Sequence, residues 1–167
     1  MVSQPENLLP AMQNFVSAGQ TLAQNFFAFL AKQPGMTPPP AGTLPPLKLP
    51  SPEEMQALHQ EYLKQHAALW AAMLAKRQGQ EPGFAVQPEP GDRRFNAPEW
   101  SETPMFDYIR QAYLLNSSFL RQVVEAVPEE DDKAKNRLRF MARQYIDALS
   151  PANFAATNPE FIKLAVE

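Results

Sequence analysis

The sequence predicts an all-α protein, a small bundle of three or four helices preceded by a separate amphipathic helix, with no β-sheet. Three observations lead to this prediction. Apolar residues recur with the 3.6-residue period of a helix through long stretches of the chain. Several stretches begin with the Ser or Thr, Pro and Glu pattern that starts helices. Proline is costly inside helices, and 13 of the 18 prolines cluster at 34–52 and 82–104, so these ranges mark joints.

The first predicted helix occupies residues 1–33. Residues 8–31 contain no charged side chain, and on a helical wheel their polar and apolar residues separate into two arcs. We predict that the apolar arc offers an interaction surface; the alternative is that it packs in the bundle core. The absence of Lys and Arg from the polar arc argues against binding to anionic lipid. The residues of the candidate surface are Phe15, Leu22, Phe26, Phe27, Phe29 and Leu30.

A proline-rich linker is predicted at residues 34–50. It contains Pro38-Pro39-Pro40 and Pro45-Pro46, a composition typical of extended, semi-rigid spacers with a reach of about 3 Å per residue. Such a tether could hold the first helix away from the bundle, which is why we favour an interaction surface over a core for its apolar arc.

Two long helices are predicted next. The first starts at Ser51-Pro52-Glu53-Glu54, with Ser51 as N-cap and Glu54 closing a capping box, and runs to about residue 77. An irregular segment of about residues 80–101 follows. Thr103-Pro104 then begins a helix that extends to about residue 127. Because apolar residues line two sides of this helix, we expect it to be buried against two neighbours.

The fourth long helix is predicted to start near Pro128. The acidic residues 129–132 would lie in its first turn, where they suit the helix dipole, and Ser150-Pro151 would end it. Its expected inner face consists of Leu138, Met141, Tyr145 and Leu149.

A last helix is predicted from the capping pattern Thr157-x-x-Glu160, with Pro159 in its first turn. Only two turns follow before Glu167, and helices that short are marginal alone. We therefore expect this chain to be part of a longer protein.

The sequence argues against several kinds of chemistry. Without cysteine it has neither disulfides nor thiolate sites, and it contains no nucleophile elbow and no phosphate-binding glycine loop. His59 and His66 would lie about 10 Å apart along a helix, too far for one metal ion. A net charge of −3 gives no field for nucleic acid. We predict no catalytic residue, no cofactor and no metal in this chain.

The cellular location predicted from the sequence is the cytoplasm. The N-terminus lacks the positive and apolar regions of a signal peptide. No continuous apolar stretch reaches about 18 residues, so we expect no transmembrane segment.

The segment Asp92-Arg93-Arg94-Phe95 with Trp100 allows two interpretations. The arginines could bind a phosphate or coenzyme A. Alternatively, they pair with Asp92 and nearby helices while Phe95 and Trp100 fill a core. We favour the structural interpretation, because the aromatic residues of an irregular segment must be buried somewhere.

Several motifs resemble the N-terminal region of class I polyhydroxyalkanoate synthases, bacterial enzymes that polymerise hydroxyacyl-CoA into storage polyester. They are the 92–100 segment, Ser150-Pro151-Ala152-Asn153-Phe154 running into Thr157-Asn158-Pro159-Glu160, and the sequences at 60–73, 113–116, 139–140 and 147–149. The resemblance covers roughly residues 62–167 and is strongest over 92–160. The signature residues, for which we expect structural roles, are Asp92, Arg93, Arg94, Phe95, Trp100, Pro151, Asn153, Phe154, Asn158 and Pro159.

The resemblance implies that residues 51–167 are a helical N-terminal domain preceding an α/β-hydrolase-type catalytic domain with a Cys-Asp-His triad. None of these three residues would lie in this chain, so we expect it to be inactive alone. The implied roles are support of dimerisation, of catalytic-domain stability and of attachment to polyester granules. The implied partners are the protein's own catalytic domain, a second copy, and the granule surface or a granule-associated protein.

Two alternatives differ from this interpretation. One is a free-standing, phasin-like granule-coat or adaptor protein. The other is an independent enzyme, which the missing nucleophile, metal ligands and phosphate loop argue against. The open reading frame beyond residue 167 separates the first two: a hydrolase-like domain favours the synthase, and a stop codon favours the coat protein.

Overall fold

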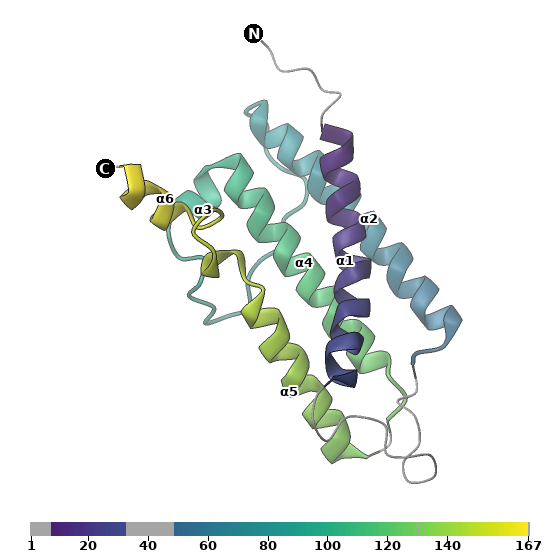
Figure 1. The fold of residues 1–167 in the computed structure, drawn as a ribbon. Coiled ribbons are helices and arrows are strands. Elements are labelled where there is room, and N and C mark those ends of the chain that lie inside the picture. The colour runs from purple at the N-terminus through teal and green to yellow at the C-terminus, as the bar shows by residue number, and fades with distance from the viewer. Residues whose placement is uncertain (1–7, 33–48, 130, 167) are drawn as a thin grey trace. The chain divides into compact units, whose positions relative to one another are not determined.

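The computed structural model describes residues 8–32, 49–129 and 131–166. Within them every regular element is a helix and no strand occurs, which confirms the predicted all-α fold (Figure 1). The predicted linker at 34–50 lies outside the described residues except for its last two. The elements are α1 (Leu8–Ala31), α2 (Pro52–Arg77), α3 (Glu99–Glu102), α4 (Pro104–Ala126), α5 (Asp132–Ala148), the 3-10 helix η2 (Pro151–Asn153) and α6 (Pro159–Val166).

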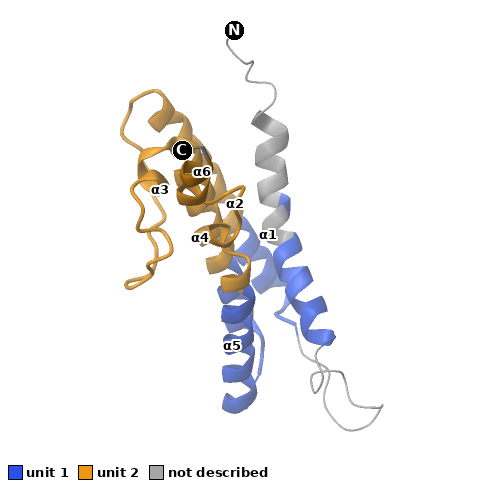
Figure 2. Ribbon diagram, turned by 60° about the vertical axis from the view of Figure 1, so that its left-hand side comes forward, with its two compact units in different colours: residues 1–60, 119–145 blue, residues 61–118, 146–167 orange. Residues whose placement is uncertain are grey.

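The chain divides into two compact units (Figure 2). Unit 1 consists of residues 1–60 and 119–145, and unit 2 of residues 61–118 and 146–167. Each of the long helices α2, α4 and α5 contributes residues to both units.

The core of unit 1 forms around α1 and the ends of α4 and α5. Phe26 and Leu30 of α1 are 0% and 3% exposed. The ring of Phe26 lies 5.5 Å from that of Tyr145 on α5, between ring centroids. A further set of buried apolar residues comes from α4 and α5: Phe119, Leu120, Val123, Val124, Leu138 and Ala142.

Within unit 1, a buried lysine caps the C-terminal end of α4. Lys135 is 7% exposed, and its Nζ donates hydrogen bonds to the carbonyl oxygens of Val124, Glu125 and Val127 at 2.7–2.8 Å. These carbonyls lie at the helix terminus, where they lack partners in the helix. Lys135 therefore satisfies the end of α4 from the next helix along the chain.

The core of unit 2 holds the irregular segment 78–98 against α4. Phe95, Trp100 and Leu114 are buried together. On α2, the residues facing this unit's interior are also buried: Tyr62, His66, Leu69, Ala72 and Met73.

The starts of α2 and α4 agree with the sequence, whereas α5 starts later than predicted and α6 has a different cap. At α2, Ser51 and Glu54 form the predicted capping box, with reciprocal bonds of 3.2 and 3.0 Å. The prediction that a helix starts near Pro128 was wrong: α5 begins at Asp132, and the carboxylate of Asp131 caps it by accepting a bond from the Lys133 N–H. At α6 the cap is Asn158 rather than Thr157, since its Oδ1 accepts bonds from the N–H groups of Glu160 and Phe161.

Candidate functional site

The aromatic residues of the first signature anchor the irregular segment of unit 2. Trp100 is fully buried and Phe95 is 6% exposed. Their rings meet edge to face with centroids 5.1 Å apart, a favourable aromatic geometry. The expected structural role of this pair agrees with its burial.

Arg94 joins three parts of unit 2. Its Nε and Nη2 donate to the two carboxylate oxygens of Asp92 at 2.9 and 2.8 Å. Its Nη1 donates to the Tyr113 hydroxyl at 2.8 Å and to the Asp147 carboxylate at 2.9 Å. The hydrogen bonds that Arg94 donates to Asp92 are the main reason that the pKa of Arg94 is raised. This set of contacts favours a structural role for Arg94, whereas Arg93 is exposed.

Tyr113 extends the same network. Its hydroxyl donates to the carbonyl oxygen of Ile146 at 2.8 Å. Burial is the main cause that raises the pKa of this phenol, with Arg94 acting in the opposite direction. Tyr113 therefore stays a neutral donor that ties α4 to the end of α5.

The second signature folds residues 150–159 into a compact turn. Asn153 Nδ2 donates to the Asp147 carbonyl at 2.9 Å, and Asn158 Nδ2 donates to the Ala152 carbonyl at 2.9 Å. Pro151 and Pro159 are buried. Phe154 differs from its neighbours, because its side chain is 50% exposed.

Exposed apolar side chains lie within this turn and on both sides of it. We call Leu149, Phe154, Phe161 and Leu164 the C-terminal apolar segment; their exposed fractions are 42%, 50%, 54% and 74%. Phe161 and Leu164 lie three residues apart, which places them on one face of α6. Leu149 was predicted to face inward, and its exposure shows that this prediction was wrong. Large apolar side chains gathered in so short a stretch are typical of interaction surfaces.

The residues of α6 are held by α3, which contacts it within unit 2. Lys163 Nζ lies 3.2 Å from Glu99 Oε1. The pKa of Glu99 is lowered chiefly by a hydrogen bond to its own backbone N–H, and hydrogen bonding to Lys163 lowers it further. The sequence did not predict α3, because a four-residue helix has no measurable apolar period.

A buried carboxylate that the sequence did not single out fixes α2 and the irregular segment to α4. Asp107 accepts hydrogen bonds from Lys76 and Arg110, each at 2.6 Å, and from Gln111 at 3.0 Å. Gln111 in turn accepts a bond of 2.6 Å from the Val86 N–H. No local pattern could reveal this network, because Lys76 and Asp107 lie 31 residues apart in the chain.

His66 is a buried residue of unit 2, 2% exposed. Its Nε2 lies 2.9 Å from Asn116 Oδ1, which also accepts a hydrogen bond of 2.8 Å from the Tyr62 hydroxyl. Burial is the main cause that lowers the pKa of His66. The burial of His66 and its contact with Asn116 give it a structural role in unit 2.

The side chains of the candidate surface on α1 differ in how far they are buried. Phe26 and Leu30 belong to the unit 1 core, so they do not contribute to an exposed surface. Leu22 and Phe27 are half-buried, and Phe29 is 38% exposed. The side chain of Phe15 lies outside the described residues. Binding of a partner by α1 stays a prediction.

The described part of the chain has neither a metal-ligand cluster nor a membrane-spanning helix. No cluster of three or more His, Asp or Glu side chains there could hold a metal ion. None of the helices described is both long and apolar enough to cross a membrane.

Comparison with known proteins gives consistent similarities. Residues 91–167 match a family described as the poly-beta-hydroxybutyrate polymerase N-terminus. A poly(3-hydroxyalkanoate) polymerase of Methylorubrum extorquens is 37% identical over 119 residues, which cover 71% of this chain and 20% of that protein. The corresponding polymerase subunit of Cupriavidus necator is 38% identical over 117 residues, or 70% of this chain and 19% of that protein.

The chain therefore spans about a fifth of the length of these curated relatives. A third similar protein, poly(3-hydroxyalkanoate) polymerase 2 of Ectopseudomonas oleovorans, is 37% identical over 79 residues, 47% of this chain and 14% of that protein. No solved structure matches the fold.

Proposed function

We propose that this chain docks on the polymerising part of a poly(3-hydroxyalkanoate) polymerase and stabilises it. The premise is that the chain contains the N-terminal domain of such an enzyme. The domain itself carries out no chemistry in this proposal. The parent protein would be an acyltransferase that makes polyester from 3-hydroxyacyl-CoA in the cytoplasm. Dimerisation and granule attachment would follow from where the docked domain lies.

The observation that carries this proposal is the exposure of the C-terminal apolar segment. It lies inside the range that matches the polymerase family, and the matched residues make up only about a fifth of each relative. Burying one Leu or Phe side chain contributes about 1.5–3 kcal/mol relative to leaving it in water. Covering these side chains with the remainder of the polymerase would therefore stabilise both parts.

The signature residues support docking because they make the segment rigid. Asn153 and Asn158 fix the turn, Arg94 ties Asp147 to the 92–100 loop, and Lys163 pairs with Glu99. A surface held in one shape loses little conformational entropy when it binds. The expected structural role of the signatures thus becomes a role in presenting the segment.

Burial favours docking over granule attachment through α1. Among the side chains of α1 that the structure describes, Phe26 and Leu30 are the most buried, so less of its apolar arc remains for a polyester surface. Phe29 is the large side chain of α1 that stays more than a third exposed in the described region.

The proposal is tested in the full-length polymerase with the double substitution Phe161→Ser and Leu164→Ser. Loss of two buried apolar side chains should lower the melting temperature of the enzyme by several degrees, and polymer formation from 3-hydroxybutyryl-CoA should fall. Phe140→Ser is the matched control, because Phe140 is 62% exposed but lies on α5 outside the segment.

The control should keep the stability and activity of the unsubstituted polymerase. If the double variant also keeps both, or if the control loses as much, docking through the C-terminal apolar segment is wrong.

A further inference from the structure

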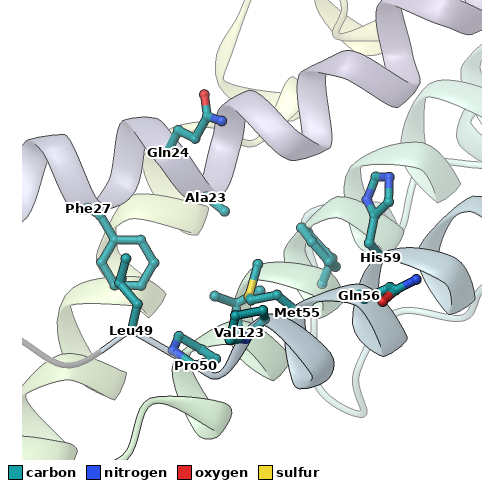
Figure 3. Close-up of a pocket in the computed structure, with 11 residues that line it drawn as sticks. Ala23, Gln24, Phe27, Leu49, Pro50, Met55, Gln56, His59 and Val123 are labelled. Carbon is teal, nitrogen blue, oxygen red and sulfur yellow. The ribbon is translucent and has the colours of Figure 1, made fainter.

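Unit 1 contains a cavity of about 590 Å³. It lies between α1, the residues that enter α2, and the second half of α4, and it is distinct from the C-terminal apolar segment. In Figure 3, Ala23 and Phe27 extend from α1 toward the side on which Met55 and Val123 lie. Its volume falls in the range of small-molecule sites, about 300–1,000 Å³.

The lining of the cavity contains no Asp, Glu, Lys or Arg. Of the 11 residues that line it, three are polar, namely Gln24, Gln56 and His59, and the others are apolar. Gln24 and Gln56 are exposed, so they lie at the rim, whereas His59 is half-buried. The walls are thus aliphatic and aromatic, and the polar side chains Gln24, Gln56 and His59 lie around them.

This chemistry excludes ligands that bear several charges. A phosphate or carboxylate placed against Phe27, Met55 and Val123 would lose its hydration without gaining a cationic partner. Coenzyme A and lipid headgroups are therefore poor occupants. An uncharged, flexible, mostly aliphatic chain would lose little hydration and would gain burial of its methylene and methyl groups.

We infer that this cavity binds a segment of an uncharged aliphatic polyester chain. The inference rests on the proposed function, because the polyester is what a poly(3-hydroxyalkanoate) polymerase makes. A polyester chain between its ends has ester oxygens that accept hydrogen bonds and no group that donates one. The side-chain amides of Gln24 and Gln56 at the rim are able to donate such bonds. The cavity would hold product chain away from the reacting end.

Binding is measured by methyl NMR on the 167-residue chain, with the methyl-ester-capped tetramer of 3-hydroxybutyrate as titrant. The Met55 methyl lines the cavity and should shift saturably. The Met105 methyl, 61% exposed in unit 2, is the internal control and should not move. Equal movement of both signals would indicate non-specific association and would overturn the inference.

Matched charge substitutions locate the site. Gln56→Glu places a carboxylate at the rim that the bound chain would desolvate, so it should weaken tetramer binding about tenfold. Gln60→Glu makes the same change one turn further along α2 at an exposed position that does not line the cavity. It should leave the affinity within about twofold. Equal effects of the two substitutions would contradict the inference.

Two further titrants distinguish a polyester site from a general apolar site and from a site for the CoA substrate. An alkyl alcohol of the same length as the tetramer should bind more weakly, because it lacks the repeated ester acceptors; equal affinity would show a general apolar site instead. 3-Hydroxybutyryl-CoA should leave Met55 unshifted. Absence of any Met55 shift with the tetramer overturns this inference alone, since docking depends on residues 149–164 and is tested separately.

Discussion

Arg94 shows how one side chain can fix an irregular segment. It contacts Asp92 in its own loop, Tyr113 on α4 and Asp147 on α5. The planar guanidinium can make these bonds in three directions at once, which a lysine ammonium at the same position cannot do with the same geometry. The loop is therefore fixed by a fork of hydrogen bonds and by the neighbouring Phe95 and Trp100.

Substitution Arg94→Lys should lower the free energy of unfolding by about 1–3 kcal/mol, because several bonds to partly buried acceptors are lost together. Arg93→Lys should change it by less than about 0.5 kcal/mol, since Arg93 is exposed. Urea unfolding of both variants compares the two effects. Equal destabilisation by the two substitutions would contradict the conclusion that Arg94 fixes the loop.

His66 makes the stability of the chain depend on pH. Its pKa in the folded state lies below the ordinary value of 6.5, chiefly because it is buried. As the pH falls below about 6.5, the unfolded chain therefore takes up this proton before the folded chain does. The stabilising contribution of neutral His66 is present above that pH and is lost as the pH falls through the lower, folded-state pKa.

The corresponding test is the free energy of unfolding measured between pH 7 and pH 5 for the unsubstituted chain and for His66→Gln. The glutamine cannot titrate, so the variant should lose less stability on acidification. Parallel pH profiles would mean that protonation of His66 does not contribute.

Among single residues, the burial of Phe95 and Trp100 could be predicted from the sequence. Phe95 and Trp100 are large apolar residues in a proline-rich segment, so burial was the expected outcome. The partners of Asp107 and His66 could not be predicted, because they come from other helices 31 and 50 residues away. Long-range polar pairing leaves no periodic signal in one sequence.

Among the helices, α1 differs most from what its sequence indicates. Its 3.6-residue period identifies the helix, but the period alone does not say what covers the apolar face. The ring contacts of Phe26 and Phe29 with Tyr145, each with centroids 5.5 Å apart, place part of that face against α5 within unit 1. Ala23, Phe26 and Leu30 are the α1 residues that the structure buries.

The substitution Phe26→Ala should destabilise the chain by about 3–5 kcal/mol, because it leaves a cavity in a packed core. Phe29→Ala is the control on the same helix and should cost clearly less, since Phe29 is 38% exposed. Thermal and urea unfolding measure both. If neither variant is destabilised by more than about 0.5 kcal/mol, the whole apolar face of α1 is a surface, as the sequence alone suggested.

The ends of the helices were predicted with mixed success for a physical reason. Ser51 and Glu54 satisfy each other within four residues, so a local pattern suffices. At α5, four acidic residues were candidates for the first turn, and the cap is formed by Asp131. At α6, both Thr157 and Asn158 can cap, but the Thr157 hydroxyl donates to the Pro151 carbonyl instead.

For the molecule as a whole, the C-terminal apolar segment connects the fold to the proposed function. The sequence predicted a helix at its end and an apolar pattern from Phe161 onward, but it could not separate side chains buried within the chain from those left exposed. That separation depends on which helices pack together. Exposure of Leu149, Phe154, Phe161 and Leu164 is the result that favours a docking domain.

Backbone hydrogen exchange tests the docking claim most directly, by comparing the 167-residue chain with the full-length polymerase. Amides of α6, at residues 159–166, should exchange quickly in the short chain and at least about tenfold more slowly in the full-length enzyme, because docking adds protection against local opening. Amides around Phe140 on α5 should exchange at similar rates in both. Equal exchange of α6 in the two proteins would contradict the proposal that this face is covered by the polymerising domain.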